Sequence, residues 1–322
     1  MVILKTSVLV GLLAVASGSG LHAAGYADHP VKVIVPFPAG GVTDIATRVI
    51  VQRLSERLGQ QFYVENIGGA GGNIGMAGAA HAAGDGYTIL FASSSIVVNP
   101  SLYKKIPFDV KKDLVPVTRA GASPNSWLVN RDFPAKTMKE LIDLMKASPG
   151  KLSVASPGTG TTPSLSIELL KQELGVSFVT VPFAGGGPMT QSLLAGFTPI
   201  ACGAIGNSVP MIKEGRIRAL AITSNKRLAT LPDVATLDEF GFKNQQAETM
   251  TGVFVPAGTP QPIVQLLQTE ISAIVQEPDI NARLEDLGIV PEGDSSADFA
   301  VYVKDEIAKW RRVIEVAKID RI

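Results

Sequence analysis

Two similar turns, "VPFPAGGVT" (Val35–Thr43) and "VPFAGGGPM" (Val181–Met189), occur in widely separated parts of the chain. In each of them a Val-Pro pair ends a short β-branched run, glycines follow, and a helical pattern begins soon afterwards. A strand, a tight turn and a helix in this order form the repeating unit of α/β proteins. The repetition predicts that the fold builds the same strand-to-helix junction twice.

The rest of the chain supports an α/β fold with a mostly parallel sheet and helices on both faces. One helix is expected after Thr43 as its N-cap, and another after Thr259, with Pro260 in its first turn. Short runs bounded by Gly or Pro predict buried strands at Val31–Phe37, Gly86–Ala92, Lys151–Ser156, Val176–Phe183 and Ile217–Thr223.

Length and composition indicate a globular protein with two lobes. The 322 residues exceed one ordinary core, 46% of them are hydrophobic, and the formal net charge is zero. Lysines and arginines form no stripe with interleaved aromatic residues, so nucleic acid is not an expected partner.

The first 27 residues resemble a secretory signal peptide. Lys5 precedes a nine-residue apolar stretch, Val8–Ala16, and Gly25 and Ala27 occupy the positions expected three and one residues before a cleavage point. The alternative is a transmembrane anchor, but such a helix needs about 20 apolar residues. We therefore expect export to the periplasm with cleavage after Ala27.

Cysteine and histidine are too few for the usual metal or thiol chemistry. Cys202 is the single cysteine and lies in an apolar run, which favours a buried hydrophobic residue over a nucleophile. His29 and His81 form no ligand spacing with each other or with Cys202. No metal and no cofactor are expected.

Three further segments share the chemistry of the two turns, since glycines and hydroxyl residues precede expected helix starts. They are "GGAGGNIG" (Gly68–Gly75), "ASSS" (Ala92–Ser95) and "SPGTGTTPS" (Ser156–Ser164). A helix N-terminus presents free N–H groups and a partial positive charge, so loops of this kind can hold a small carboxylate.

Two alternatives to an anion site remain open for these loops. Glycine also makes ordinary tight turns. Gly69, Gly71 and Gly75 form a loose G-x-G-x-x-x-G, which suggests a dinucleotide site, although the spacing differs from the usual motif. No acidic residue stands between Gly86 and Phe108 to bind a ribose.

Several long segments resemble the Bug family, the periplasmic substrate-binding proteins of tripartite tricarboxylate transporters. The resemblance runs in order through the chain at Val33–Gly75, Gly84–Phe91, Asn99–Thr118, Ile212–Thr223 and Leu231–Phe242. It implies a two-lobed Venus-flytrap fold of the type II periplasmic binding proteins. Residues 28–123 and 251–322 would form lobe 1 and residues 124–250 lobe 2, with crossings near 119–127 and 248–255.

The resemblance also implies which residues contact a ligand. Carried over position by position, they are Phe37, Ala39, Gly40, Gly41, Asp44, Gly72, Asn73, Ser93, Ser94, Ser95, Thr159, Gly160, Thr161, Thr162, Phe183, Ala184 and Gly185. Asp44 has two interpretations: it caps a helix start, or it orients a water or meets a ligand ammonium. Trp127 would either stack on the ligand or pack at the crossing.

The chain departs from the family pattern at several positions of the cleft. Phe183-Ala184-Gly185 replaces a common Tyr-Lys-Gly, Gly203-Ala204 an Asp-Asn pair, and Ser164 a His. The cleft is therefore less charged than usual, which favours a monocarboxylate, an aromatic acid or a small dicarboxylate over a citrate-like ligand.

The expected function is capture of a small carboxylate and its delivery to a membrane permease by a monomeric binding protein. A sensory protein of the same fold and an enzyme are the alternatives. The sequence has no G-x-S-x-G elbow and no P-loop, so an enzyme would have to use carboxylate or Ser/Thr chemistry.

Overall fold

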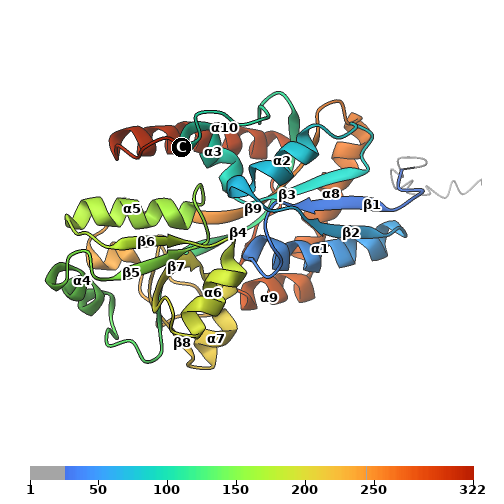
Figure 1. Cartoon of the computed structure of the whole chain (residues 1–322). Helices are drawn as coiled ribbons and strands as arrows, with labels where there is room; N and C mark the ends of the chain where they lie inside the picture. The colour runs from blue at the N-terminus through green and yellow to red at the C-terminus, as the bar shows by residue number, and fades with distance from the viewer. Residues whose placement is uncertain (1–25, 244) are drawn as a thin grey trace, which may run out of the picture.

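The computed structural model describes residues 26–243 and 245–322, and its strands form one strongly curved sheet (Figure 1). The strands are β1 (Val31–Val35), β2 (Phe62–Asn66), β3 (Thr88–Ala92), β4 (Leu114–Asn130), β5 (Ser153–Ser156), β6 (Val179–Pro182), β7 (Ile200–Ala204), β8 (Ile217–Ile222), β9 (Glu248–Pro256) and β10 (Val290–Pro291). The five predicted strands form as β1, β3, β5, β6 and β8, but β6 is an edge strand and is not buried as predicted.

Helices cover the sheet, and many of them follow directly after a strand in the chain. They are α1 (Val42–Leu58), α2 (Asn73–Ala80), α3 (Ser95–Leu102), α4 (Met138–Ala147), α5 (Thr162–Leu174), α6 (Gly186–Leu194), α7 (Val209–Lys213), α8 (Gln261–Gln276), α9 (Pro278–Asp286) and α10 (Ser296–Val316). Short 3₁₀ turns are η1 (Ala70–Gly72), η2 (Ile205–Asn207) and η3 (Leu237–Phe240).

The sheet is mixed, so the prediction of a mostly parallel sheet needs correction. Strand order is β2-β1-β3-β9-β4-β7-β5-β6, and β8 and β10 also pair with β4. The outer strands are parallel, β1 with β2 and β3, and β5 with β6 and β7. The central strands β4 and β9 are antiparallel to each other and to β3 and β7, because they carry the chain back and forth between the two ends of the sheet.

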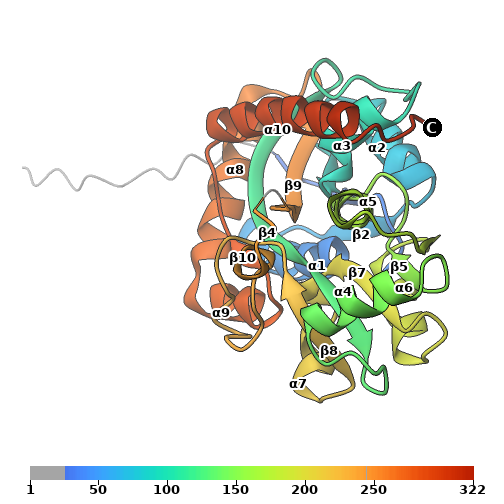
Figure 2. The ribbon, with the colours of Figure 1, turned by 90° about the vertical axis from the view of Figure 1, so that its left-hand side faces the viewer.

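Strand β4 belongs to both ends of the sheet. Its residues Leu114–Pro124 pair with β9, whereas Asn125–Asn130 pair with β7 and β8. We call β1–β3, β9, β10 and the first part of β4, with α1–α3 and α8–α10, the first half of the fold. The second half holds β5–β8, the second part of β4 and α4–α7. Figure 2 shows β4 running through both.

Each half has its own hydrophobic core. In the second half, Trp127 is fully buried, and its ring meets that of Phe178 edge-on with 6.5 Å between ring centroids. Trp127 thus packs in the core of the second half, whereas one of its two interpretations proposed packing at the crossing between the lobes. Cys202 on β7 is also fully buried, and burial raises the pKa of its thiol, which fits a small hydrophobic residue.

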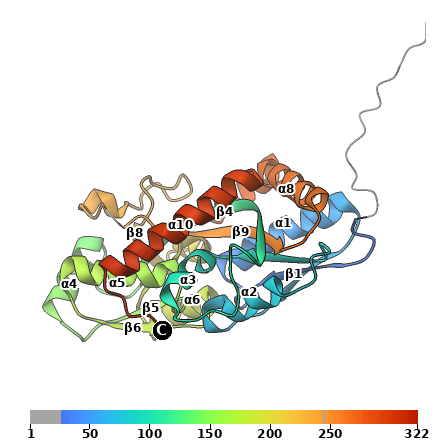
Figure 3. The same ribbon diagram turned by 90° about the horizontal axis from the view of Figure 1, so that it is seen from above.

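The C-terminal helix joins the two halves. Figure 3 shows α10 extending from the region of α8 across to α5. Beyond its last turn, the backbone carbonyl of Ala317 accepts a hydrogen bond from the side-chain amide of Gln172 on α5.

The expected signal peptide lies outside the described residues except for Tyr26 and Ala27. The Tyr26 hydroxyl donates to the carbonyl oxygen of Gly86 at 2.8 Å, and its ring lies 5.6 Å from that of Tyr87. Within residues 26–243 and 245–322, no helix combines the length and apolar character needed to span a membrane.

Candidate functional site

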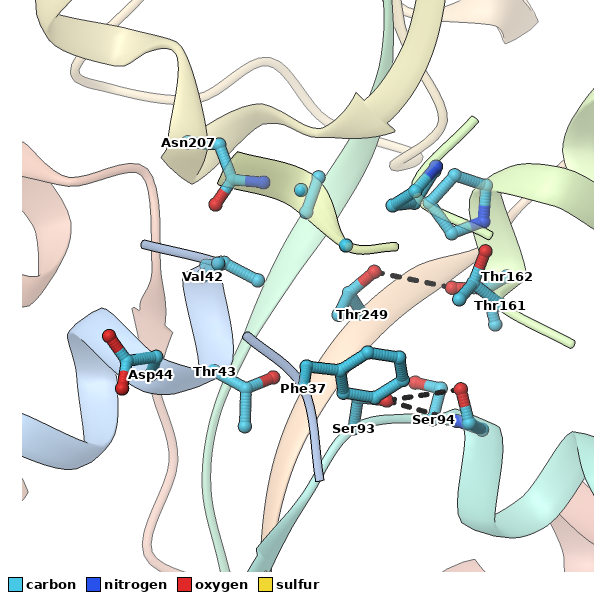
Figure 4. Close-up of a pocket in the computed structure, with 17 residues that line it drawn as sticks. Phe37, Val42, Thr43, Asp44, Ser93, Ser94, Thr161, Thr162, Asn207 and Thr249 are labelled. Atoms are coloured by element: carbon cyan, nitrogen blue, oxygen red, sulfur yellow. Dashed lines mark hydrogen bonds between the residues drawn. The ribbon is translucent and has the colours of Figure 1, made fainter. Parts of the chain in front are cut away.

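A cavity with about 470 Å³ of empty space lies between the two halves, where strands end and helices begin (Figure 4). The first half lines it with Phe37, Gly41, Val42, Thr43, Asp44, Ser93, Ser94, Ser95 and Thr249. The second half lines it with Pro157, Thr161, Thr162, Pro163, Gly185, Gly186, Ala204 and Asn207.

Four helices of the described chain begin at this cavity. Their N-cap residues are Gly41 for α1, Ser94 for α3, Thr161 for α5 and Gly185 for α6, and all four line the cavity. Each helix N-terminus carries a partial positive charge and N–H groups without partners inside the helix. Two such termini from each half therefore point at one shared volume.

The glycine N-caps leave backbone donors free for a ligand. Gly41 and Gly185 make no side-chain capping bond, whereas Thr161 caps α5 by accepting from the N–H of Ser164. The predicted N-caps Thr43 and Thr259 are both wrong, since α1 is capped by Gly41 and α8 by Pro260. Extended backbone angles at Gly41 start α1 two residues early, which places Thr43 inside the first turn, facing the cavity.

The two similar glycine turns, Val35–Thr43 and Val181–Met189, contact each other at the edge of the cavity. A Cβ added to Gly187 would lie 3.0 Å from the carbonyl oxygen of Ala39, and one added to Gly185 would lie 3.3 Å from Cδ of Pro38. Gly185 also has a φ of 143°, which side chains rarely tolerate. The glycines thus allow the two halves to approach until their backbones nearly touch.

Asp44 organises the first turn and has no oxygen left for a ligand ammonium. Its carboxylate accepts from the backbone N–H of Gly40 at 3.0 Å, from Nε of Arg48 at 3.1 Å and from Nδ2 of Asn66 at 2.9 Å. Burial alone would raise the pKa of Asp44, but these hydrogen bonds outweigh it and the pKa is lowered. In Figure 4 the carboxylate points away from the centre of the cavity.

Hydroxyl groups from both halves meet at the start of β9. The carbonyl oxygen of Glu248 accepts from Ser94 Oγ at 2.8 Å and from Thr162 Oγ1 at 3.1 Å. Thr249 Oγ1 lies 3.3 Å from Thr162 Oγ1 and donates to Asn125 Oδ1 at 3.0 Å. These bonds tie the N-termini of α3 and α5 to the same strand, so the positions of the two helix starts are coupled.

Nine of the predicted contacts line the cavity: Phe37, Gly41, Asp44, Ser93, Ser94, Ser95, Thr161, Thr162 and Gly185. The remaining eight do not: Ala39, Gly40, Gly72, Asn73, Thr159, Gly160, Phe183 and Ala184. Ala39 and Gly40 belong to the turn that meets Gly187, which explains their absence from the lining.

The other loops make contacts away from the cavity. Within the first half, Asn73 Oδ1 accepts from Asn99 Nδ2 at 2.9 Å. A Cβ on Gly160 would lie 2.4 Å from Asn99 Oδ1, and Thr159 and Gly160 line a separate hollow beside residues 319–322. These loops thus pack the second half against α3 and the C-terminal segment.

Several lining residues were not predicted. Val42, Thr43, Pro157, Pro163 and Gly186 stand inside the quoted turns and could have been included. Thr249 is on a crossing strand, and Asn207 ends the 3₁₀ turn after β7, where no pattern of strand, glycines and helix marks a binding loop. Ala204, the last residue of β7, is one of the cleft positions where the chain departs from the family pattern.

The electrostatics of the cavity come from backbone rather than from basic side chains. Among its described lining residues there is no Lys, Arg or His, and the one acid, Asp44, is already fully bonded. The described part of the chain also holds no cluster of three His, Cys, Asp or Glu that could bind a metal ion. The arrangement can bind an anion through N–H groups and hydroxyls, with Phe37, Val42 and Ala204 as apolar walls.

Comparison with known proteins identifies the family. Residues 46–319 match the model of the tripartite tricarboxylate transporter family receptors. BugT of Bordetella pertussis is 34% identical, over 90% of this chain and 89% of that protein.

Solved structures agree with this match. The R. palustris protein Rpa4515 with adipate has a TM-score of 0.89 and 32% identity, covering 92% of this chain and 100% of that one. MatC from Rhodopseudomonas palustris with bound malate has a TM-score of 0.84 and 35% identity, covering 89% of this chain and 99% of that one. The chain therefore belongs to the tripartite tricarboxylate transporter receptors, the family of periplasmic solute-binding proteins that includes BugT.

Proposed function

We propose that this protein captures a small carboxylate in the cavity between its halves and delivers it to the permease of a tripartite tricarboxylate-type transporter. The observation that carries the proposal is the convergence of four helix N-termini on a cavity without a basic side chain. Solved structures of similar proteins hold adipate and malate, which supports a carboxylate as the ligand class.

The helix termini can replace the usual arginine clamp. A partly buried helix N-terminus stabilises an anion by up to about 2 kcal/mol, so several of them together offset much of the cost of removing a carboxylate from water. Hydrogen bonds from N–H groups of α1 and α6 to an ionised oxygen add to this. The Phe37 ring and the Val42 side chain provide apolar contact for the rest of the ligand.

Binding without turnover is the expected outcome. An acyl- or proton-transfer enzyme needs a nucleophile or base held by a second group. The hydroxyls of Ser94, Thr162 and Thr249 donate to Glu248 and Asn125 oxygens instead, and the Asp44 carboxylate is occupied by three donors. We propose that the lining residues bind the ligand and that none of them reacts with it.

We further propose that the two halves are lobes that close on the ligand. Residues 28–123 and 251–322 would form one lobe and residues 124–250 the other, joined through β4 and the start of β9. The change of partners within β4 at Pro124 and Asn125 supports a hinge there. Ligand would shift the population towards the closed form, because only that form brings all four helix termini to it.

Export follows from the sequence of the N-terminal segment and from the family. We propose a periplasmic location after removal of a signal peptide, and a monomeric protein that contacts its permease only transiently. Deletion of the gene for a neighbouring permease should abolish uptake of the ligand while leaving binding by the purified protein intact.

Thermal unfolding of the purified mature protein against mono-, di- and tricarboxylates, with neutral and cationic solutes as controls, tests the binding claim. A ligand at 100 times its dissociation constant stabilises the protein by about 2.7 kcal/mol, which raises the midpoint by several degrees. A rise confined to carboxylates supports the proposal. A rise only with neutral or cationic solutes would refute it.

A further inference from the structure

One buried side chain at the cavity, Asn207, has no hydrogen-bonding partner for its carboxamide oxygen. Asn207 ends η2 directly after β7, and only 8% of its surface is exposed. Within the described residues, its Oδ1 accepts no hydrogen bond. In Figure 4 the carboxamide lies near Val42, on the opposite side of the cavity from Thr161 and Thr162.

The backbone of the second glycine turn holds this carboxamide in place. A Cβ added to Gly186 would lie 2.0 Å from Asn207 Nδ2, so the amide rests directly on the first residue of α6. A side chain at position 186 would displace the amide from the cavity. Glycine at this position therefore leaves room for a polar group beside the helix N-terminus.

Another asparagine shows that the fold can satisfy a buried carboxamide. Asn130 has the same 8% exposure. Its Nδ2 donates to the carbonyl oxygen of Leu193 at 2.9 Å, and its Oδ1 accepts from the N–H of Asp132 at 2.9 Å. A buried polar atom without a partner lowers stability, so its presence at a ligand cavity suggests that the ligand supplies the missing partner.

We infer that Asn207 is a specificity-determining residue that selects a hydroxy-carboxylic acid. The inference rests on the proposed function, in which the cavity holds a carboxylate. Oδ1 is an acceptor and requires an O–H or N–H donor, which an ionised carboxylate does not have. A hydroxyl group on the ligand donates to Oδ1, while Nδ2 can donate to the hydroxyl oxygen or to the adjacent carboxylate.

The charge of the cavity favours a hydroxyl over an ammonium as this donor. Asp44 is the one carboxylate in the described lining, and its oxygens accept from Gly40, Arg48 and Asn66. A buried ammonium would therefore lack a free counter-charge and would face four positive helix ends. A neutral hydroxyl supplies the donor without that cost.

Calorimetric titration of the mature protein with matched acids tests this inference. The pairs are lactate and propionate, malate and succinate, and mandelate and phenylacetate, which differ by one hydroxyl. In at least one pair we expect the hydroxylated acid to bind about tenfold tighter or more, because a site built for a hydroxyl rejects an analogue that lacks it. In N207L this preference should fall to about onefold.

The matched control is N130L, which removes a carboxamide of equal exposure far from the cavity. It should keep the hydroxyl preference but unfold at a lower temperature than the wild type, because it leaves the Leu193 carbonyl and the Asp132 N–H without their partner. Without ligand, N207L should unfold at the wild-type temperature or above it, since it removes a group that has no partner in the protein.

The outcomes separate this inference from the proposed function. Acids that bind with no hydroxyl preference in any pair would overturn the role of Asn207 and leave carboxylate capture intact. Persistence of the preference in N207L, or a loss of its stability equal to that of N130L, would also overturn it. Failure of every acid to bind would overturn both proposals.

Discussion

Gly187 and Ala39 meet across the edge of the cavity, where a Cβ on Gly187 would lie 3.0 Å from the Ala39 carbonyl oxygen. The two residues come from different halves of the fold, at equivalent strand-to-helix junctions. Their contact explains the glycines of the second turn physically, because the first half approaches the backbone there closely enough to crowd a side chain. The same turns begin α1 and α6, whose N-termini point into the cavity.

A β-branched side chain at Gly187 should weaken ligand binding without unfolding the protein. G187V would hold the halves apart by collision with Ala39, so we expect at least a tenfold loss of affinity in calorimetric titration, about 1.4 kcal/mol or more. Position 187 is helical, and helix propensity favours Val over Gly slightly.

The control for this substitution is G78A. A Cβ on Gly78, within α2, meets no atom within 4 Å, so G78A should raise stability by up to about 1 kcal/mol and leave affinity unchanged. Wild-type affinity in G187V would contradict the role assigned to the contact between the turns.

Loss of the Asp44 charge should destabilise the protein in a pH-dependent manner. The pKa of Asp44 is lower in the folded chain than the ordinary value of about 3.9, because the bonds from Arg48, Gly40 and Asn66 favour its charged form. Its contribution to stability is therefore complete above that ordinary value and is lost as the pH falls through the folded pKa.

We expect D44N to be about 1–3 kcal/mol less stable than the wild type at pH 7, and the difference to shrink below about pH 4. Urea unfolding at pH 7, 5 and 3 measures it. A difference that is constant over this range would show that the charge of Asp44 contributes nothing.

The side chain of Ser94 should stabilise the fold through its two hydrogen bonds to β9. Its Oγ donates to the Glu248 carbonyl at 2.8 Å and accepts from the Met250 N–H at 2.9 Å, and both backbone groups are on β9. S94A removes the partner of the Met250 N–H and leaves the Glu248 carbonyl with Thr162 Oγ1 as its remaining side-chain donor, so we expect a loss of about 1–3 kcal/mol in the free energy of unfolding. A variant as stable as the wild type, compared by chemical denaturation, would show that these hydrogen bonds contribute nothing net.

Tyr26 should remain in the exported protein. The expected cleavage after Ala27 would remove a side chain that donates to Gly86 and packs on Tyr87. We therefore predict that signal peptidase cuts before Tyr26, and that Y26A lowers the free energy of unfolding by about 1 kcal/mol or more. The intact mass of the periplasmic protein decides the first point, and an N-terminus at Asp28 would contradict it.

Local sequence patterns predict the parts of the fold that local physics controls. The runs that became β1, β3, β5 and β8 are short, apolar and bounded by Gly or Pro, so their burial can be read from them directly. The run that became β6 has the same pattern but lies at the edge of the sheet, where Val179 is 55% exposed. Strand β4 was not predicted because Pro116, Gly121 and Pro124 interrupt its pattern. It is held as a strand by β9, β7 and β8, which are distant in sequence.

The candidate site likewise has parts that local sequence patterns predict and parts that depend on contacts between distant segments. The glycine turns stand out because a strand, glycines and a helix are adjacent in the sequence, whereas the individual contact residues are what the resemblance to the Bug family implies. Thr249 and Asn207 reach the cavity only through the pairing of β9 and the turn after β7, which no local pattern encodes. The role of Asp44 also depended on Asn66, whose amide comes from the neighbouring strand β2.

The most direct test of carboxylate capture by helix termini is a calorimetric comparison of the tightest-binding acid with its primary amide. The two have nearly the same shape, but only the acid carries the negative charge that the four N-termini stabilise. We predict that the acid binds at least about 100-fold tighter than the amide. Equal affinity for the two would contradict the account, because the helix termini would then contribute nothing to recognition.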